Sequence, residues 1–146
     1  MTIIRSATEL LIIGYLAFLT FYDIRHKRVT DKSLIFFLPI ILLKCTLTVI
    51  CGSLLDLIPM LVGAAAGFGI LLVAAMLTNG GIGGGDIKLT GVLGLATGVN
   101  GMCVMLTVAS FAAVVYGAIY NKRKKTAIRI PFVPFMAVGY VITLFI

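Results

Sequence analysis

The sequence predicts an all-α integral membrane protein, and its composition and hydropathy lead to that prediction. Of the 146 residues, 61% are hydrophobic and 12% are charged, whereas soluble domains carry about 25% charged residues. The mean hydropathy is +1.18, and the apolar residues are gathered into long continuous stretches. Lipid, and not water, is therefore expected to surround most of this chain.

The apolar stretches are expected to be helices that cross the membrane. Backbone groups left unpaired in hydrocarbon are costly, so only helices and closed barrels span bilayers, and barrel strands need only about 9–11 residues. The first stretch is kept as a span, because no small-residue cleavage site follows it. We predict a bundle of six spans that forms a single domain over residues 1–146. The predicted spans are Ala7–Tyr22, Leu34–Ile50, Leu54–Thr78, Ile87–Thr97, Met102–Tyr120 and Pro131–Ile146.

Basic residues predict how the bundle is oriented. Of the twelve lysines and arginines, all but Arg5 and Lys44 fall in the first loop, the fifth loop or the start of the fourth span, which share one side. Positively charged loops stay in the cytoplasm, so both termini are expected to lie outside. The even-numbered loops, Cys51–Ser53 and Gly98–Gly101, are short and uncharged. This topology accounts for the net charge of +7, and nucleic acid is not expected as a partner.

Glycines predict which helices approach closely. Gly63 and Gly67 in the third span, and Gly94 and Gly98 in the fourth, have the Gly-x-x-x-Gly spacing that brings helix backbones together. The fourth span is short, because about eleven residues cover only ~17 Å of a ~30 Å hydrocarbon core. The glycine-rich run Asn79–Asp86 that precedes it is therefore expected to lie below the membrane surface, beside a wet cavity.

Two aspartates are candidates for catalysis. Asp23 ends the first span and Asp86 begins the fourth, so the predicted topology puts both at the cytoplasmic face. Ionisable residues near membrane depth are functional candidates, and two neighbouring carboxyl groups share one proton. One carboxylate can then deprotonate water while the other carboxyl polarises a peptide carbonyl, without a metal ion. From its position alone, Asp23 is equally well explained as a loop acid paired with Arg25 or Lys27.

The residues around Asp86 extend this candidate site. Gly83, Gly84 and Gly85 precede it and exceed what a helix cap needs. Glycines let an extended peptide approach and hydrogen-bond beside the carboxylates, although a flexible turn is the simpler alternative. Lys88 could stabilise ionised Asp86, position a substrate or mark the membrane boundary, and boundary marking is our default interpretation.

Three ordered segments carry a resemblance to a known family. Gly83–Leu89 reads as a Gly-x-Gly-Asp motif, and Tyr22–Asp31 is an aspartate followed by a basic loop, with Thr30 where a proline is usual. Ile130–Gly139 is similar to a Pro-Phe-Gly-Pro-Phe stretch, with Val133 in place of the glycine. Together these segments resemble the type IV prepilin peptidases and archaeal preflagellin peptidases.

The resemblance implies an aspartic endopeptidase that cleaves the short basic leader from prepilin-like precursors at the cytoplasmic membrane face. It implies no metal or cofactor. The implied site residues are the catalytic Asp23 and Asp86 and the site-shaping Gly83, Gly84, Gly85 and Lys88. Larger relatives also N-methylate the new terminus through a domain with paired Cys-x-x-Cys motifs. Since Cys45, Cys51 and Cys103 form no such pair, the short peptidase-only form, such as those of tight-adherence pili, is expected.

Two other functions are alternatives at this point. The presenilin and signal peptide peptidase families also combine a Tyr-Asp helix, which Tyr22 and Asp23 fit, with a Gly-x-Gly-Asp helix. Those families resemble larger bundles with a Pro-Ala-Leu element, which this sequence does not contain. A small non-enzymatic transport or assembly protein could instead use the aspartates to bind an ion or a proton.

Two charges inside the first and second spans predict an ion pair. Glu9 lies fourteen residues above Asp23 and Lys44 lies ten above Leu34, heights of about 21 Å and 15 Å at helical rise. A lysine stem can bridge that difference. We therefore expect Glu9 and Lys44 to be paired within the bundle.

Overall fold

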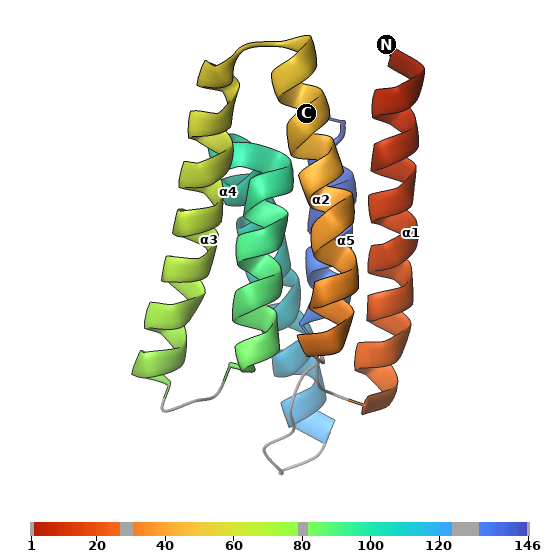
Figure 1. Cartoon of the computed structure of the whole chain (residues 1–146). Coiled ribbons are helices and arrows are strands. Elements are labelled where there is room, and N and C mark those ends of the chain that lie inside the picture. The colour runs from red at the N-terminus through yellow and green to blue at the C-terminus, as the bar shows by residue number, and fades with distance from the viewer. Residues whose placement is uncertain (1, 27–30, 79–81, 124–131, 146) are drawn as a thin grey trace.

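The computed structural model describes residues 2–26, 31–78, 82–123 and 132–145, and these parts of the chain form helices without any strand. The all-α class is thereby confirmed (Figure 1). The elements are α1 (Thr2–His26), α2 (Asp31–Cys51), the 3₁₀ helix η1 (Leu54–Asp56), α3 (Leu57–Leu77), α4 (Gly84–Arg123) and α5 (Val133–Thr143). Most of the basic first and fifth loops, residues 27–30 and 124–131, and part of the glycine-rich run, residues 79–81, lie outside the described residues.

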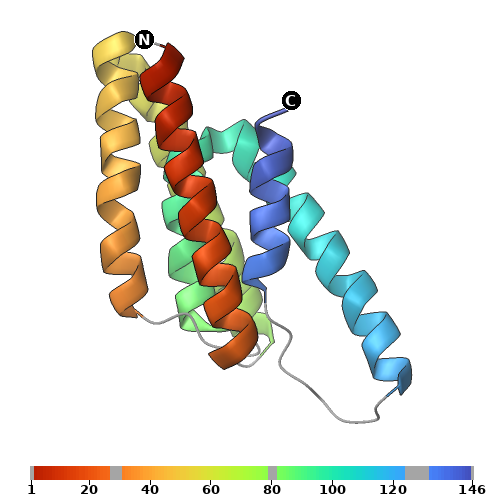
Figure 2. The same cartoon turned by 90° about the vertical axis from the view of Figure 1, so that its right-hand side faces the viewer.

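Helix α4 changes direction at Gly98, so the predicted count of six separate spans is not confirmed. Gly98 has φ 67° and ψ −174°, a conformation that essentially only glycine adopts. Figure 2 shows the two arms of α4 diverging from this bend. The bend falls where the sequence predicted a loop, Gly98–Gly101, but helical geometry resumes at once and the described residues form five α-helices.

The helices are those of a multi-pass membrane protein. Four of them contain segments long and apolar enough to cross a bilayer, namely Ser6–His26, Ser33–Ile50, Leu54–Leu77 and Gly84–Ile119. The remaining helix α5 is also apolar but shorter. Large side chains such as Phe36 and Leu77 are 73% and 80% exposed, which suits a surface that faces lipid.

Glycine contacts hold α4 against its neighbours. A Cβ atom placed on Gly63 would lie 2.7 Å from the carbonyl oxygen of Gly94 and 2.6 Å from the carbonyl carbon of Gly98. The predicted close packing of the third and fourth spans is therefore confirmed. On the other arm, a Cβ atom on Gly139 of α5 would lie 2.7 Å from the carbonyl oxygen of Met105.

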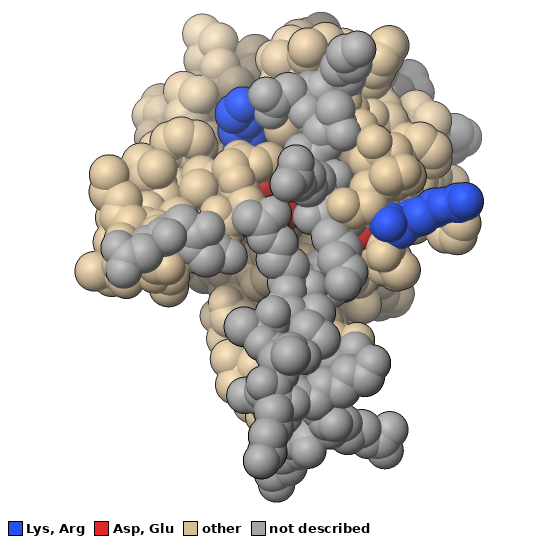
Figure 3. All heavy atoms as spheres, turned by 90° about the horizontal axis from the view of Figure 1, so that it is seen from below, with Lys and Arg blue, Asp and Glu red and all other residues tan. Residues whose placement is uncertain are grey.

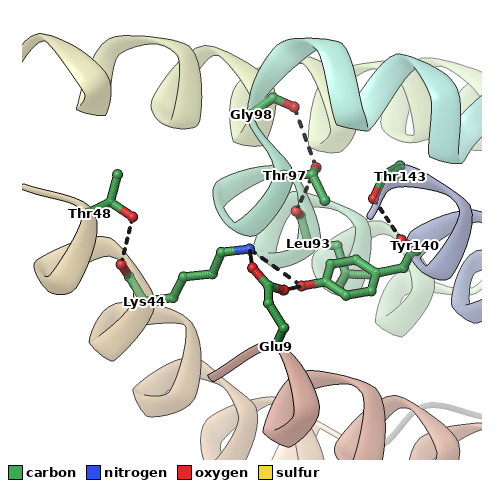
Figure 4. A network of polar contacts seen from close by, with 8 residues as sticks. All are labelled: Glu9, Lys44, Thr48, Leu93, Thr97, Gly98, Tyr140 and Thr143. Atoms are coloured by element: carbon green, nitrogen blue, oxygen red, sulfur yellow. Dashed lines mark hydrogen bonds and ion pairs between the residues drawn. The ribbon is translucent and has the colours of Figure 1, made fainter. Parts of the chain in front are cut away.

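A polar network joins α1, α2 and α5 in the half of the bundle near the termini (Figure 4). Lys44 Nζ lies 2.7 Å from Glu9 Oε1, so the predicted ion pair is confirmed. The Tyr140 hydroxyl donates to Glu9 Oε2 at 2.6 Å and accepts from Lys44 Nζ at 3.4 Å. Tyr140 was not predicted as a partner. Because each charge has an opposite charge and a hydrogen bond, the apolar interior tolerates both.

Candidate active site

The two candidate aspartates lie at the end of the bundle opposite the termini. Asp23 is in the last turn of α1 and Asp86 in the first turn of α4, and both of these helix ends lie at the lower end of the bundle in Figure 1. Figure 3 looks onto this end and shows acidic atoms recessed near its centre, with basic side chains toward two sides. The structure thus places both carboxyl groups at the same end of the bundle (Figure 1), while their catalytic roles stay predictions.

Asp23 is held by the beginning of α5. Its side chain is 4% exposed, and its Oδ2 atom accepts a hydrogen bond from the backbone N–H of Val133 at 3.3 Å. Val133 is the first residue of α5 and is fully buried. Backbone N–H groups in a first helical turn have no partner within the helix and carry the positive end of its dipole. This contact therefore favours a negative charge on Asp23.

Asp86 has a different environment. Its backbone N–H donates to the carbonyl of Gly83 at 3.0 Å, and its own carbonyl accepts from the hydroxyl of the buried Thr90 at 2.7 Å. Its side-chain Oδ1 atom is buried and has no hydrogen-bond partner among the described residues. An ionised carboxylate with an unpaired buried oxygen is costly, so this environment favours the neutral acid.

The glycines before Asp86 differ in what they contribute. A Cβ atom on Gly83 would lie 3.1 Å from Asp86 Oδ2, whereas one on Gly84 would meet nothing within 4 Å. Gly83 therefore leaves room for the carboxylate, and Gly84 faces open space. Gly85 is half-buried in the same turn.

The fourth predicted span began too late, at Ile87. Helix α4 begins at Gly84, because the backbone N–H groups of Asp86 and Ile87 bond to the Gly83 carbonyl. Lys88 lies two residues after Asp86 in this helix and is exposed, and its role stays a prediction.

Two features near the candidate aspartates were missed from the sequence. Val133 was noted only as a replacement for glycine, and a backbone donor leaves no trace in side-chain chemistry. Thr20 precedes Asp23 by three residues on the same helix face, and its hydroxyl oxygen is buried without a partner among the described residues. Its spacing from Asp23 was the available signal. Buried polar atoms are nearly always paired, so such a hydroxyl suits a water molecule or a substrate group.

A separate pocket of about 530 Å³ lies at the other end of the bundle, beside the bend in α4. Lys44, Asp56 and Gly98 are among its lining residues, and neither candidate aspartate is. Asp56 accepts the backbone N–H of Ser53 at 2.9 Å and so caps η1, which gives it a structural role. Over the described ranges, no group of three His, Cys, Asp or Glu side chains could hold a metal ion.

Comparison with known proteins identifies the family. The model of the type IV leader peptidase family matches residues 10–118, a range that includes both aspartates. A prepilin leader peptidase/N-methyltransferase from Bacillus subtilis (strain 168) is 36% identical over 126 residues, which cover 82% of this chain and 48% of the relative. The chain thus spans about half the length of that relative, and no solved structure matches it significantly. This chain belongs to the type IV leader peptidase family.

Proposed function

We propose that this chain is a membrane aspartic endopeptidase that removes the short basic leader from prepilin-like precursors. The observation that carries the proposal is the position of two carboxyl groups, Asp23 and Asp86, from separate helices at one end of a membrane bundle (Figure 1). Membership of a leader peptidase family makes peptide hydrolysis the reaction that best fits such a pair. The name of the Bacillus subtilis relative supports prepilin as the substrate class.

The proposed reaction uses one ionised and one protonated carboxyl group. The carboxylate takes a proton from a water molecule whose oxygen bonds to the scissile carbonyl carbon, and the acid gives its proton to the carbonyl oxygen. The resulting gem-diol collapses when the C–N bond breaks. The leaving amine takes the proton from the first aspartate, and the second recovers its proton from the diol. One water is consumed, and the pair returns to its starting state.

We also propose that the aspartate pair faces the cytoplasm, that both termini lie outside and that the chain crosses the cytoplasmic membrane six times. Each arm of α4 would then make one crossing. Support for this orientation comes from Arg25 and Lys88, which lie exposed at the aspartate end, and from the basic first and fifth loops of the sequence. The two termini share the opposite end (Figure 1).

We propose further that these 146 residues cleave without N-methyl transfer. The match covers 48% of a relative whose name includes both activities. Cys45 is buried in α2 and Cys103 is exposed in α4, and the sequence contains no Cys-x-x-Cys pair. The paired cysteine motifs of the larger relatives are therefore not present in this segment.

The test is co-expression with a candidate prepilin from the same genome, followed by N-terminal sequencing of the product. Asp23→Asn and Asp86→Asn should each lose nearly all cleavage, and the double variant should be little worse, because the two residues act as a unit. Asp31→Asn and Asp56→Asn, compared at equal amounts in membranes, are the controls and should keep substantial activity. Cleavage that survives either single variant at the pair would refute the two-aspartate mechanism.

A further inference from the structure

We infer that Asp23 is the ionised member of the pair, that Asp86 carries the shared proton, and that the backbone N–H of Val133 sets this order. The catalytic roles that follow from this assignment rest on the proposed peptidase function. Its geometry stands on the contacts of the two carboxyl groups, which differ between α1 and α4.

The contact at Asp23 favours the anion. The N–H of Val133 donates to Asp23 Oδ2 at 3.3 Å in a place where both residues are buried. Hydrogen bonds to an ionised group are stronger than those to a neutral one. Residues 133–139 contain no ionisable side chain, so the stabilisation from α5 comes from its backbone.

The contacts at Asp86 favour the acid. Its Oδ1 atom is buried without a partner in the described part of the chain, and its Oδ2 atom lies over Gly83. The dipole of α4 favours an anion at the same place. This dipole effect is smaller than the cost of an unpaired buried charge, so the neutral form is preferred.

The surrounding charged groups do not reverse this order. Arg25 and His26, on the same helix as Asp23, are exposed, as is Lys88 on α4, and solvent screens their charges. Asp23 lies at the same end of the bundle as Asp86 (Figure 1), and a negative charge nearby favours retention of the proton on Asp86. Helix α2 begins with Asp31 and Lys32, whose side chains are outside the described set.

The order assigns the steps of the reaction. Asp23 takes the proton from the attacking water, and Asp86 gives its proton to the carbonyl oxygen. Val133 is a positioning residue that acts through Asp23. Glycine at this position, as in the related motif, would supply the same N–H.

Infrared difference spectroscopy of the full chain at neutral pH tests where the proton lies. The band of a protonated carboxyl group should disappear in Asp86→Asn, and a carboxylate band should disappear in Asp23→Asn. The reverse pattern, or loss of the same kind of band in both variants, would overturn the assignment. This measurement needs no substrate, so it stays decisive even if no prepilin is cleaved.

Val133→Pro tests the positioning role. Proline is well tolerated in the first position of a helix but has no N–H to donate. The pH of half-maximal kcat/KM on the acid side should rise by about one unit. Val133→Ala is the matched control, because it truncates the same buried side chain but keeps the N–H, and its acid limb should stay at the wild-type pH. Equal acid limbs in both variants would overturn the role of Val133, and if Val133→Pro does not fold, the infrared result decides.

Discussion

Replacing Lys44 by leucine should destabilise the protein through the charge that it leaves behind. In Lys44→Leu, the carboxylate of Glu9 keeps one hydrogen-bond partner among the described residues, the hydroxyl of Tyr140, which donates to it at 2.6 Å. The side chains of Lys44 and Glu9 are 11% and 19% exposed, so little solvent is available to replace the lost ammonium group. The variant therefore carries a poorly compensated charge in the bundle.

The magnitude follows from this geometry. Removing one partner of a buried ion pair costs about 3–5 kcal/mol. Because Glu9 keeps one strong hydrogen bond and some exposure, we expect about 2–4 kcal/mol for Lys44→Leu. The double variant Glu9→Leu with Lys44→Leu removes both charges, so it should lie within about 1 kcal/mol of wild type. Tyr140→Phe removes the hydrogen bonds of one hydroxyl to Glu9 and Lys44 and should cost about 1.5–3 kcal/mol.

Unfolding of these three variants and of the single variant Glu9→Leu in one detergent, by denaturant or heat, measures these differences. The reasoning requires the double variant to be more stable than either single leucine variant, since the cost lies in the orphaned charge and not in lost packing. A single leucine variant as stable as wild type would refute a structural role for the pair. A double variant less stable than both singles would refute the charge argument.

Three further predictions concern the glycines and the reaction. Gly83→Ala should lower cleavage about tenfold with little change in stability, because its Cβ atom would lie 3.1 Å from Asp86 Oδ2 and small misplacements of reacting groups are costly. The control is Gly69→Ala, whose Cβ atom would meet nothing within 4 Å. Equal cleavage by the two variants would contradict this prediction. Gly98→Ala should lower the free energy of unfolding by about 1–3 kcal/mol, because an alanine would be strained in the backbone conformation that Gly98 adopts at the bend. An unchanged melting temperature would argue against that conformation. Purified protein should transfer no methyl group from labelled S-adenosylmethionine to cleaved pilin, and labelled product would disprove this.

Several features of the site could be predicted from the sequence because the membrane limits the alternatives. Asp23 ends the first apolar stretch and Asp86 begins the fourth, with two predicted spans between them. Because consecutive spans cross the membrane in opposite directions, both aspartates are expected on the same side. Glu9 and Lys44 could be paired because they are the charges within two adjacent apolar stretches, and hydrocarbon leaves an unpaired charge few other solutions.

The tertiary structure decided which groups become partners, because this depends on how the helices are rotated and shifted against one another. Helix α5 is apolar on all sides apart from Tyr140 and its last residue, Thr143, so its sequence does not indicate which face meets α1. Only docking of α5 brings the Tyr140 hydroxyl to Glu9 and the Val133 N–H to Asp23. Likewise, hydropathy marked an interruption near Gly98, but the backbone conformation there determines that α4 bends and continues. Hydrophobic pattern thus determined membrane insertion and the ends at which charges lie, whereas close packing determined their partners, because lipid does not discriminate between the faces of an apolar helix.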